Sequence, residues 1–212
     1  MNRRATRMLT RVIAIAPCLA TGTFCADRNT QRAVNYFPLE VGARWIYQVL
    51  RNGGARGQVS VKVTDRTDSP DGTTYSLTYE DSSLPRDEQD DEPIEYSVRR
   101  EGVYCEKCPG FVLRDPLVVG REWQSGGDST RPEVSKVIAV TETVTVGQTR
   151  YDNCVVVRAS DLQARQQVVT TYAPNVGPVV VEYENNRGVV ERREELQRFQ
   201  RASAKATGEP GH

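Results

Sequence analysis

The chain carries one eight-residue pattern twice, P-L-x-x-G-x-x-W, at residues 38–45 and 116–123. These two copies contain both tryptophans of the protein. Proline fixes φ and glycine accepts positive φ, so each copy predicts a turn that leads into a strand and buries its tryptophan. We therefore expect a single β-domain over residues 35–200, made of two related halves, 36–113 and 114–196. The structural residues of the pattern are Pro38, Gly42, Trp45, Pro116, Gly120 and Trp123.

Short β-branched and aromatic runs separated by turn residues follow each copy. Val59, Val61 and Val63 alternate with polar residues, which is the period of a half-buried strand. Similar runs lie at 45–49, 75–79, 94–98, 103–105, 138–140, 144–146, 154–157, 168–172, 179–183 and 189–196. The Glu and Arg content of the last run favours a helix, but its neighbours favour a strand, which we predict. The pattern indicates an all-β fold of about ten strands, a mostly antiparallel curled sheet that is barrel-like or a sandwich.

The N-terminal region has the pattern of an export signal. A basic stretch with four arginines precedes an apolar segment at 12–19 that is too short to span a membrane. We predict a signal peptide at 1–26, a linker at 27–34 and a disordered tail at 201–212. The alternative to a cleaved signal is lipidation at Cys18 or Cys25, although neither follows the small residue that a lipoprotein signal prefers. The mature chain is expected to be periplasmic, outer-membrane-associated or extracellular, without a transmembrane span.

Charge and histidine content exclude several functions. The 28 basic and 28 acidic residues give no net charge, which argues against nucleic-acid binding. The only histidine is His212, so a histidine-based triad or a His-ligated metal site is not expected. No phosphate-binding glycine loop is present. We predict no catalytic residues, no cofactor and no metal.

The cysteines of the mature region allow two interpretations. Cys105 and Cys108 form a C-x-x-C, which in an oxidising compartment most simply closes as a disulfide. A redox pair is the alternative, but such enzymes place the first cysteine at a helix N-terminus, and this pair lies between predicted strands. Cys154 begins an apolar run and is expected to be a buried thiol.

An acidic segment covers residues 80–93. It contains seven carboxylates: Glu80, Asp81, Asp87, Glu88, Asp90, Asp91 and Glu92. Their oxygens could bind calcium, but the alternating spacing and the glycine of calcium loops are missing. The composition favours a solvated, mobile loop.

Several of these motifs occur together in a known group of proteins. The stretch Y-F-P-L-x-x-G-x-x-W-x-Y at 36–47, the second P-L-x-x-G-x-x-W and Y-A-P-N-V-G-P-V at 172–179 resemble a large, mostly uncharacterised family of bacterial secreted proteins and lipoproteins. The likeness covers residues 36–196 and adds Tyr172, Pro174 and Gly177 to the structural residues. It implies a β-sheet envelope domain and no particular reaction. The C-x-x-C lies outside the shared pattern.

These observations favour a non-enzymatic binding or structural module of the cell envelope. Its partner would be an apolar ligand, a lipid or another envelope protein, because a curled sheet can enclose a cavity. Trp45, Tyr47 and Trp123 could line such a pocket, although aromatic residues beside turns are more often core anchors. The alternatives are a hydrolase that uses two carboxylates and a thiol–disulfide protein that uses Cys105 and Cys108.

Overall fold

A computed structural model of the chain describes residues 31–89, 92–108, 110–126, 133–161 and 166–202. The predicted signal peptide, with Cys18 and Cys25, lies outside the described residues, and so do residues 203–212 of the predicted tail.

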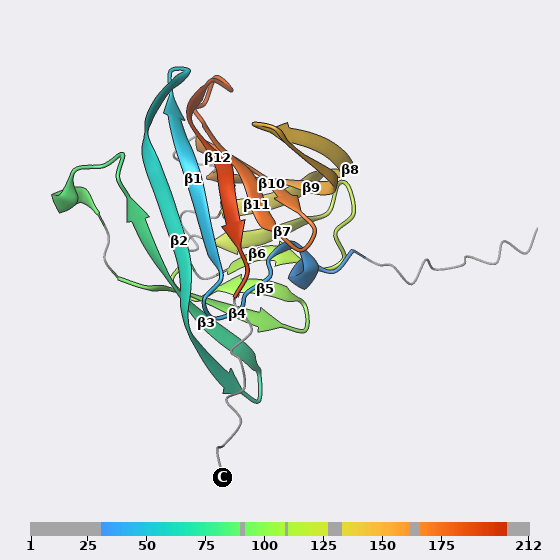
Figure 1. Cartoon of the computed structure of the whole chain (residues 1–212). Helices are drawn as coiled ribbons and strands as arrows, with labels where there is room; N and C mark the ends of the chain where they lie inside the picture. The colour runs from blue at the N-terminus through green and yellow to red at the C-terminus, as the bar shows by residue number, and fades with distance from the viewer. Residues whose placement is uncertain (1–30, 90–91, 109, 127–132, 162–165, 203–212) are drawn as a thin grey trace, which may run out of the picture.

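The described residues form one antiparallel sheet of twelve strands (Figure 1). The first six are β1 (Arg44–Arg51), β2 (Gly54–Ser69), β3 (Gly72–Asp81), β4 (Ile94–Arg99), β5 (Gly102–Cys105) and β6 (Gly110–Arg114). The second six are β7 (Glu122–Gly126), β8 (Glu133–Val146), β9 (Thr149–Asp161), β10 (Gln166–Ala173), β11 (Gly177–Glu184) and β12 (Val190–Gln200). Two short 3₁₀ helices, η1 (Ala33–Tyr36) and η2 (Arg86–Glu88), are also present.

The strand order is an up-and-down meander that almost closes on itself. It runs β6-β5-β4-β3-β2-β1-β12-β11-β10-β9-β8-β7, so each six-strand half is a meander and the pairing of β1 with β12 joins the halves. The outer strands β6 and β7 lie in contact, which makes the sheet barrel-like. The predicted all-β, antiparallel, barrel-like fold is therefore confirmed.

The predicted strands differ from the observed ones in two places. Strand β6 was not expected, because it has only five residues, whereas β7 is the strand into which the second P-L-x-x-G-x-x-W turn leads. Strand β8 joins the predicted runs 138–140 and 144–146 through register shifts. The last run is the strand β12, as predicted, since it pairs with β1 on one side and β11 on the other.

The two P-L-x-x-G-x-x-W turns have the same backbone bonds. The Gly42 amide donates to the Val63 carbonyl and the Gly120 amide to the Val137 carbonyl, both at 2.9 Å. Gly42 and Gly120 have φ of +94° and +86°, which explains the glycine in each copy. The two copies of the pattern therefore form the same turn.

Both tryptophans are core residues. Trp45 is 1% exposed and its indole N–H donates to the Val176 carbonyl at 2.6 Å. Trp123 is 4% exposed and donates to the Phe111 carbonyl at 2.6 Å, which links β7 to β6 where no strand pairing does so. Gly177 permits the first arrangement, because a Cβ at that position would lie 3.2 Å from the Trp45 Nε1.

The segment from Ala33 to Tyr36 packs into the interior, and residues 27–30 of the predicted linker lie outside the described residues. Ala33 belongs to η1, is fully buried and donates its amide to the Asp115 Oδ1 at 2.7 Å. The Tyr36 hydroxyl donates to the Asn153 carbonyl at 2.9 Å. The polar sequence of this segment gives no indication of these long-range hydrogen bonds. Arg201, placed in the predicted tail, also contacts the domain, through the Asn175 carbonyl at 3.3 Å.

Candidate functional site

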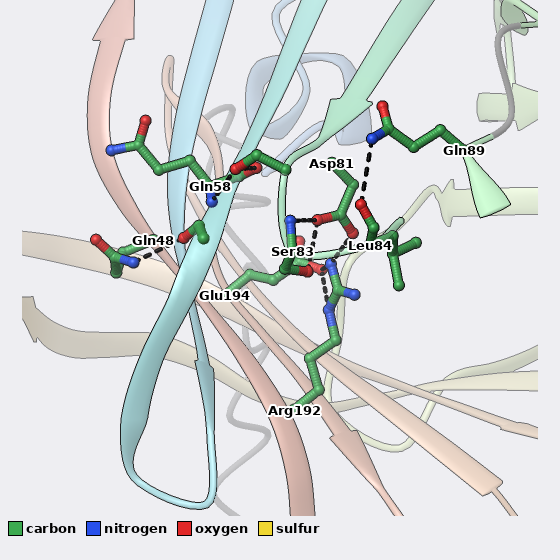
Figure 2. Close-up of polar contacts among 10 residues, drawn as sticks. Gln48, Gln58, Asp81, Ser83, Leu84, Gln89, Arg192 and Glu194 are labelled. Carbon is green, nitrogen blue, oxygen red and sulfur yellow. Dashed lines mark hydrogen bonds and ion pairs between the residues drawn. The ribbon is translucent and has the colours of Figure 1, made fainter. Parts of the chain in front are cut away.

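A pocket of about 490 Å³ opens between the sheet and the connection from β3 to β4. Its apolar lining comes from Val59, Tyr79, Leu84, Ile94 and Tyr183, and its polar lining from Asp81, Glu88, Gln89, Arg192 and Glu194. The β3–β4 connection carries η2, and Figure 1 shows this connection extending from the sheet at the edge of the molecule. The Gln89 amide donates to the Leu84 carbonyl at 3.3 Å and fastens this connection (Figure 2).

A smaller cavity of about 160 Å³ lies beside the pocket, and it is lined largely by residues of the sheet interior. The two share Tyr79, Tyr183 and Glu194. Aromatic side chains dominate the smaller cavity, whose lining includes Phe37, Trp45, Tyr47, Tyr96 and Tyr172. Because the two neighbouring spaces share Tyr79, Tyr183 and Glu194, we refer to them together as the tyrosine pocket.

Strand alternation and sheet curvature direct these side chains to one place. Alternate residues of a strand face the same side, so Val59 and Val61 of β2 both line the hollow. Strands β3 and β11 are separated in the sheet by β2, β1 and β12, yet Tyr79 and Tyr183 line the same pocket. The sheet must therefore curl enough for its inner face to close on itself.

Arg192 connects two carboxylates at the mouth of the tyrosine pocket (Figure 2). Its Nη2 donates to the Asp81 Oδ2 at 2.6 Å and lies 2.9 Å from the Glu194 Oε1, which also accepts from Nε at 2.9 Å. The other Asp81 oxygen accepts from the Ser83 amide at 2.9 Å and from the Ser83 hydroxyl at 2.6 Å. The side chains of Asp81, Arg192 and Glu194 are 15%, 17% and 9% exposed.

The two carboxylates differ in their electrostatics. Burial raises the pKa of Glu194, and the nearby Arg192 only partly offsets this. Burial also opposes ionisation of Asp81, but hydrogen bonds from Ser83 and Arg192 outweigh it and lower its pKa. Asp81 is therefore the more strongly ionised partner, and Glu194 holds its proton more readily.

The tyrosine hydroxyls lie within the hollow. The Tyr47 hydroxyl donates to the Pro178 carbonyl at 3.0 Å, and the Tyr79 and Tyr96 hydroxyls share a hydrogen bond of 3.3 Å. Burial raises the pKa of Tyr47 and Tyr79 well above the usual value. Tyr183 is 38% exposed, but its hydroxyl end is enclosed beside Glu194, and burial raises its pKa as well. All of these groups stay neutral at physiological pH.

The acidic segment at 80–93 differs from its predicted form. Glu80 and Asp81 belong to β3, and Asp81 is held in an ion pair instead of lying in a solvated loop. Asp90 and Asp91 lie outside the described residues. Within the described part of the chain, no group of three or more His, Cys, Asp or Glu side chains could hold a metal ion.

Sequence reasoning missed Arg192 and Glu194. A usable signal was present, because Arg192 and Glu194 share the two-residue phase of Leu196, the one apolar residue in this stretch of β12 and a buried one. A charged residue at an inward position of a strand is unusual and indicates a paired or functional group.

The cysteines have structural environments. Cys105 and Cys108 form a disulfide with a Cα–Cα distance of 5.3 Å. Cys105 is fully buried at the end of β5, and so it does not occupy the first turn of a helix, which is where thiol–disulfide enzymes place the reactive cysteine. Cys154 is a free, buried thiol, as expected, and burial raises its pKa to about 11. A thiol of that pKa is a poor nucleophile at neutral pH.

Among the described residues, no helix is both long and apolar enough to cross a membrane. Comparison of the sequence with models of protein families and with curated proteins gives no match.

The fold itself is found in solved structures. A predicted exported protein with a YmcC-like fold from Bacteroides fragilis superposes with a TM-score of 0.51 at 13% identity, over 78% of this chain and 98% of that one. A predicted lipoprotein from Parabacteroides distasonis gives 0.45 at 15% identity, with coverages of 78% and 98%. MucB gives 0.35 at 14% identity, over 82% of this chain and 57% of its own. The first likeness shows that this chain shares the YmcC-like fold.

Proposed function

We propose that this protein is an exported module of the cell envelope that binds an apolar ligand in the tyrosine pocket without transforming it. The observation that carries the proposal is the hollow of about 490 Å³ with an apolar, aromatic lining and a few polar groups at its mouth. This size and composition are typical of small-molecule sites. One side of the pocket is built on paired strands, and the other side is the β3–β4 connection with Leu84, Glu88 and Gln89.

Three observations support the export part of the proposal. The N-terminal sequence has a basic and then an apolar segment. The Cys105–Cys108 disulfide suits an oxidising compartment. The protein of the same fold from Bacteroides fragilis is itself a predicted exported protein. Mass spectrometry of the protein isolated from its host would detect cleavage after the signal, or a lipid on Cys18 or Cys25.

The binding proposal can be tested with a neutral apolar fluorophore such as N-phenyl-1-naphthylamine. We expect saturable binding with one site per chain. Leu84→Glu places a charge in the apolar lining and should abolish this binding. Val119→Glu is the matched control, because Val119 is 59% exposed and lies outside the pocket lining. Absence of saturable binding, or equal loss in both variants, would contradict the proposal.

A carboxylate hydrolase is a second candidate, and one observation favours it. Asp81 and Glu194 lie in one pocket with oxygens close to the same Arg192 nitrogen, and their pKa values shift in opposite directions. Glycosidases that retain configuration use two carboxyl groups about 5 Å apart. Here, however, the guanidinium lies between the two carboxylates, where the scissile bond would have to be.

The hydrolase candidate is tested with chromogenic glycosides and esters. Activity that falls at least a hundredfold in both Asp81→Asn and Glu194→Gln would establish it. Activity that is absent, or that survives both substitutions, would leave the binding function alone.

A further inference from the structure

The tyrosine pocket has more negatively charged than positively charged side chains in its lining. Among its described lining residues there are three carboxylates, Asp81, Glu88 and Glu194, and one guanidinium, Arg192. The guanidinium already donates to both Asp81 and Glu194. An anionic headgroup beside Arg192 would also lie close to Asp81 and Glu194, the two carboxylates that this guanidinium already pairs, and would be repelled by them. The pocket therefore disfavours anions.

The aromatic lining of the pocket favours cations. The face of a tyrosine ring is electron-rich and attracts cations. Tyr183 already has a cation beside it, since the Arg192 guanidinium carbon lies 5.5 Å from its ring centroid. Tyr79 lines the same space, and Glu194, only 7% exposed, lies beside both spaces of the hollow. An organic cation would meet tyrosine rings and a carboxylate that Arg192 shares with Asp81.

We propose that the tyrosine pocket selects amphiphiles with a cationic headgroup, a quaternary or primary ammonium attached to a short apolar chain. The inference rests on the proposed function, that the pocket binds an apolar ligand. The headgroup would lie beside Glu194 and the tyrosine rings, and the chain against Val59, Leu84 and Ile94, all of which line the larger space.

The experiment compares probes that share one tail. Decyltrimethylammonium, decyl maltoside and decanoate are titrated separately into the full-length protein by calorimetry, below micelle formation and at neutral pH. Tetramethylammonium, the headgroup without a tail, is a fourth probe. We expect the cationic amphiphile to bind about tenfold more tightly than decanoate, with the maltoside in between. Tetramethylammonium should bind far more weakly than the decyl cation, because it buries no chain.

Two variants locate the selectivity. Glu194→Gln keeps the shape of the side chain and should remove most of the cation preference while the maltoside still binds. Glu101→Gln is the matched control, because Glu101 is exposed and lies outside the pocket lining, and it should change the preference little. Thermal unfolding of each variant establishes that it is folded.

Each outcome decides a separate point. Equal or tighter binding of decanoate would overturn the cation preference and leave the binding module intact. If the Glu194→Gln variant still prefers the cationic amphiphile over decanoate, the cation does not bind beside Glu194 in the tyrosine pocket. If tetramethylammonium binds as tightly as the decyl cation, the apolar chain contributes nothing. That result would overturn the proposal that the ligand is an amphiphile and would indicate a small free amine. Failure of all the decyl probes would overturn the proposed function together with this inference.

Discussion

Arg192 donates to Asp81 across the inner face of the sheet, at 2.6 Å and over 111 positions of sequence. Asp81 ends β3 and Arg192 lies in β12, and β2 and β1 separate these strands in the sheet. The contact therefore joins two strands that are not neighbours in the sheet, at the mouth of the tyrosine pocket. The same Arg192 guanidinium also pairs with Glu194.

Arg192→Met keeps most of the aliphatic stem and removes the charge. We expect a loss of about 3 kcal/mol in the free energy of unfolding, because two largely buried carboxylates then lie unpaired and close together. Urea unfolding measures the loss. The triple change Asp81→Asn, Glu194→Gln and Arg192→Met should recover most of it. Arg66→Met is the control, since the Arg66–Asp68 pair is exposed, and it should have no measurable effect. A stable Arg192→Met variant would contradict the prediction.

Glu194→Gln should change how stability depends on pH. The folded pKa of Glu194 is raised above the value of 4.5 that applies to the unfolded chain, so the folded state holds this proton longer. Wild type and variant should be equally stable below pH 4.5. As pH rises from there to the folded pKa, the wild type should lose stability relative to the variant, and the gap should then stay constant.

Asp81→Asn is the counterpart in the same urea titration. The folded pKa of Asp81 is lowered below 3.8, so its stabilisation is present above that pH and is lost as the pH falls through the folded pKa. The wild type should therefore exceed this variant in stability at neutral pH and approach it in acid. A gap that does not vary with pH in either variant would show that the two carboxylates are not shifted as described.

Trp45→Ala and Trp123→Ala should each lose about 3–5 kcal/mol of stability, because each removes a large buried side chain. Trp45→Phe and Trp123→Phe keep much of the apolar contact but remove the indole N–H, so each should lose only about 1–2 kcal/mol. Chemical denaturation of all four variants checks this. If an alanine variant folds with wild-type stability but no longer binds an apolar dye, that tryptophan belongs to the site and not to the scaffold.

Gly177→Ala tests the contact between the Y-A-P-N-V-G-P-V hairpin and the first tryptophan. The new Cβ would lie 3.2 Å from the Trp45 Nε1, at a residue with φ of +100°. Gly188→Ala is the control for backbone strain alone, because φ there is +72° and nothing lies within 4 Å of the added Cβ. We expect the control to lose about 1 kcal/mol and Gly177→Ala to lose more. Equal losses would show that the Trp45 contact contributes nothing.

Cys154 should resist alkylation in the native protein. Burial raises its pKa to about 11, so little thiolate is present near pH 8, and the sulfur is also inaccessible. Peptide mapping after treatment with iodoacetamide should find Cys154 unmodified in buffer and modified in denaturant. Rapid modification in buffer would mean that the β8–β9 region opens readily.

The all-β class, the turns and the core tryptophans were determined by the sequence. Alternation of side chains and the φ demands of proline and glycine are local properties, so Val59 to Val63 and the two P-L-x-x-G-x-x-W copies were sufficient. The disulfide followed from the close spacing of Cys105 and Cys108. Strand β6 was missed because five residues carry little periodicity.

Only the tertiary structure decided where the pocket lies. Tyr79, Tyr183 and Glu194 come from three strands that meet because the sheet curls, and curvature is a property of the whole sheet. The P-L-x-x-G-x-x-W pattern marks the scaffold, but the roles of Asp81 and Arg192 depend on a contact over 111 positions. No local pattern specifies such a contact, because it forms only once the strands between them have paired.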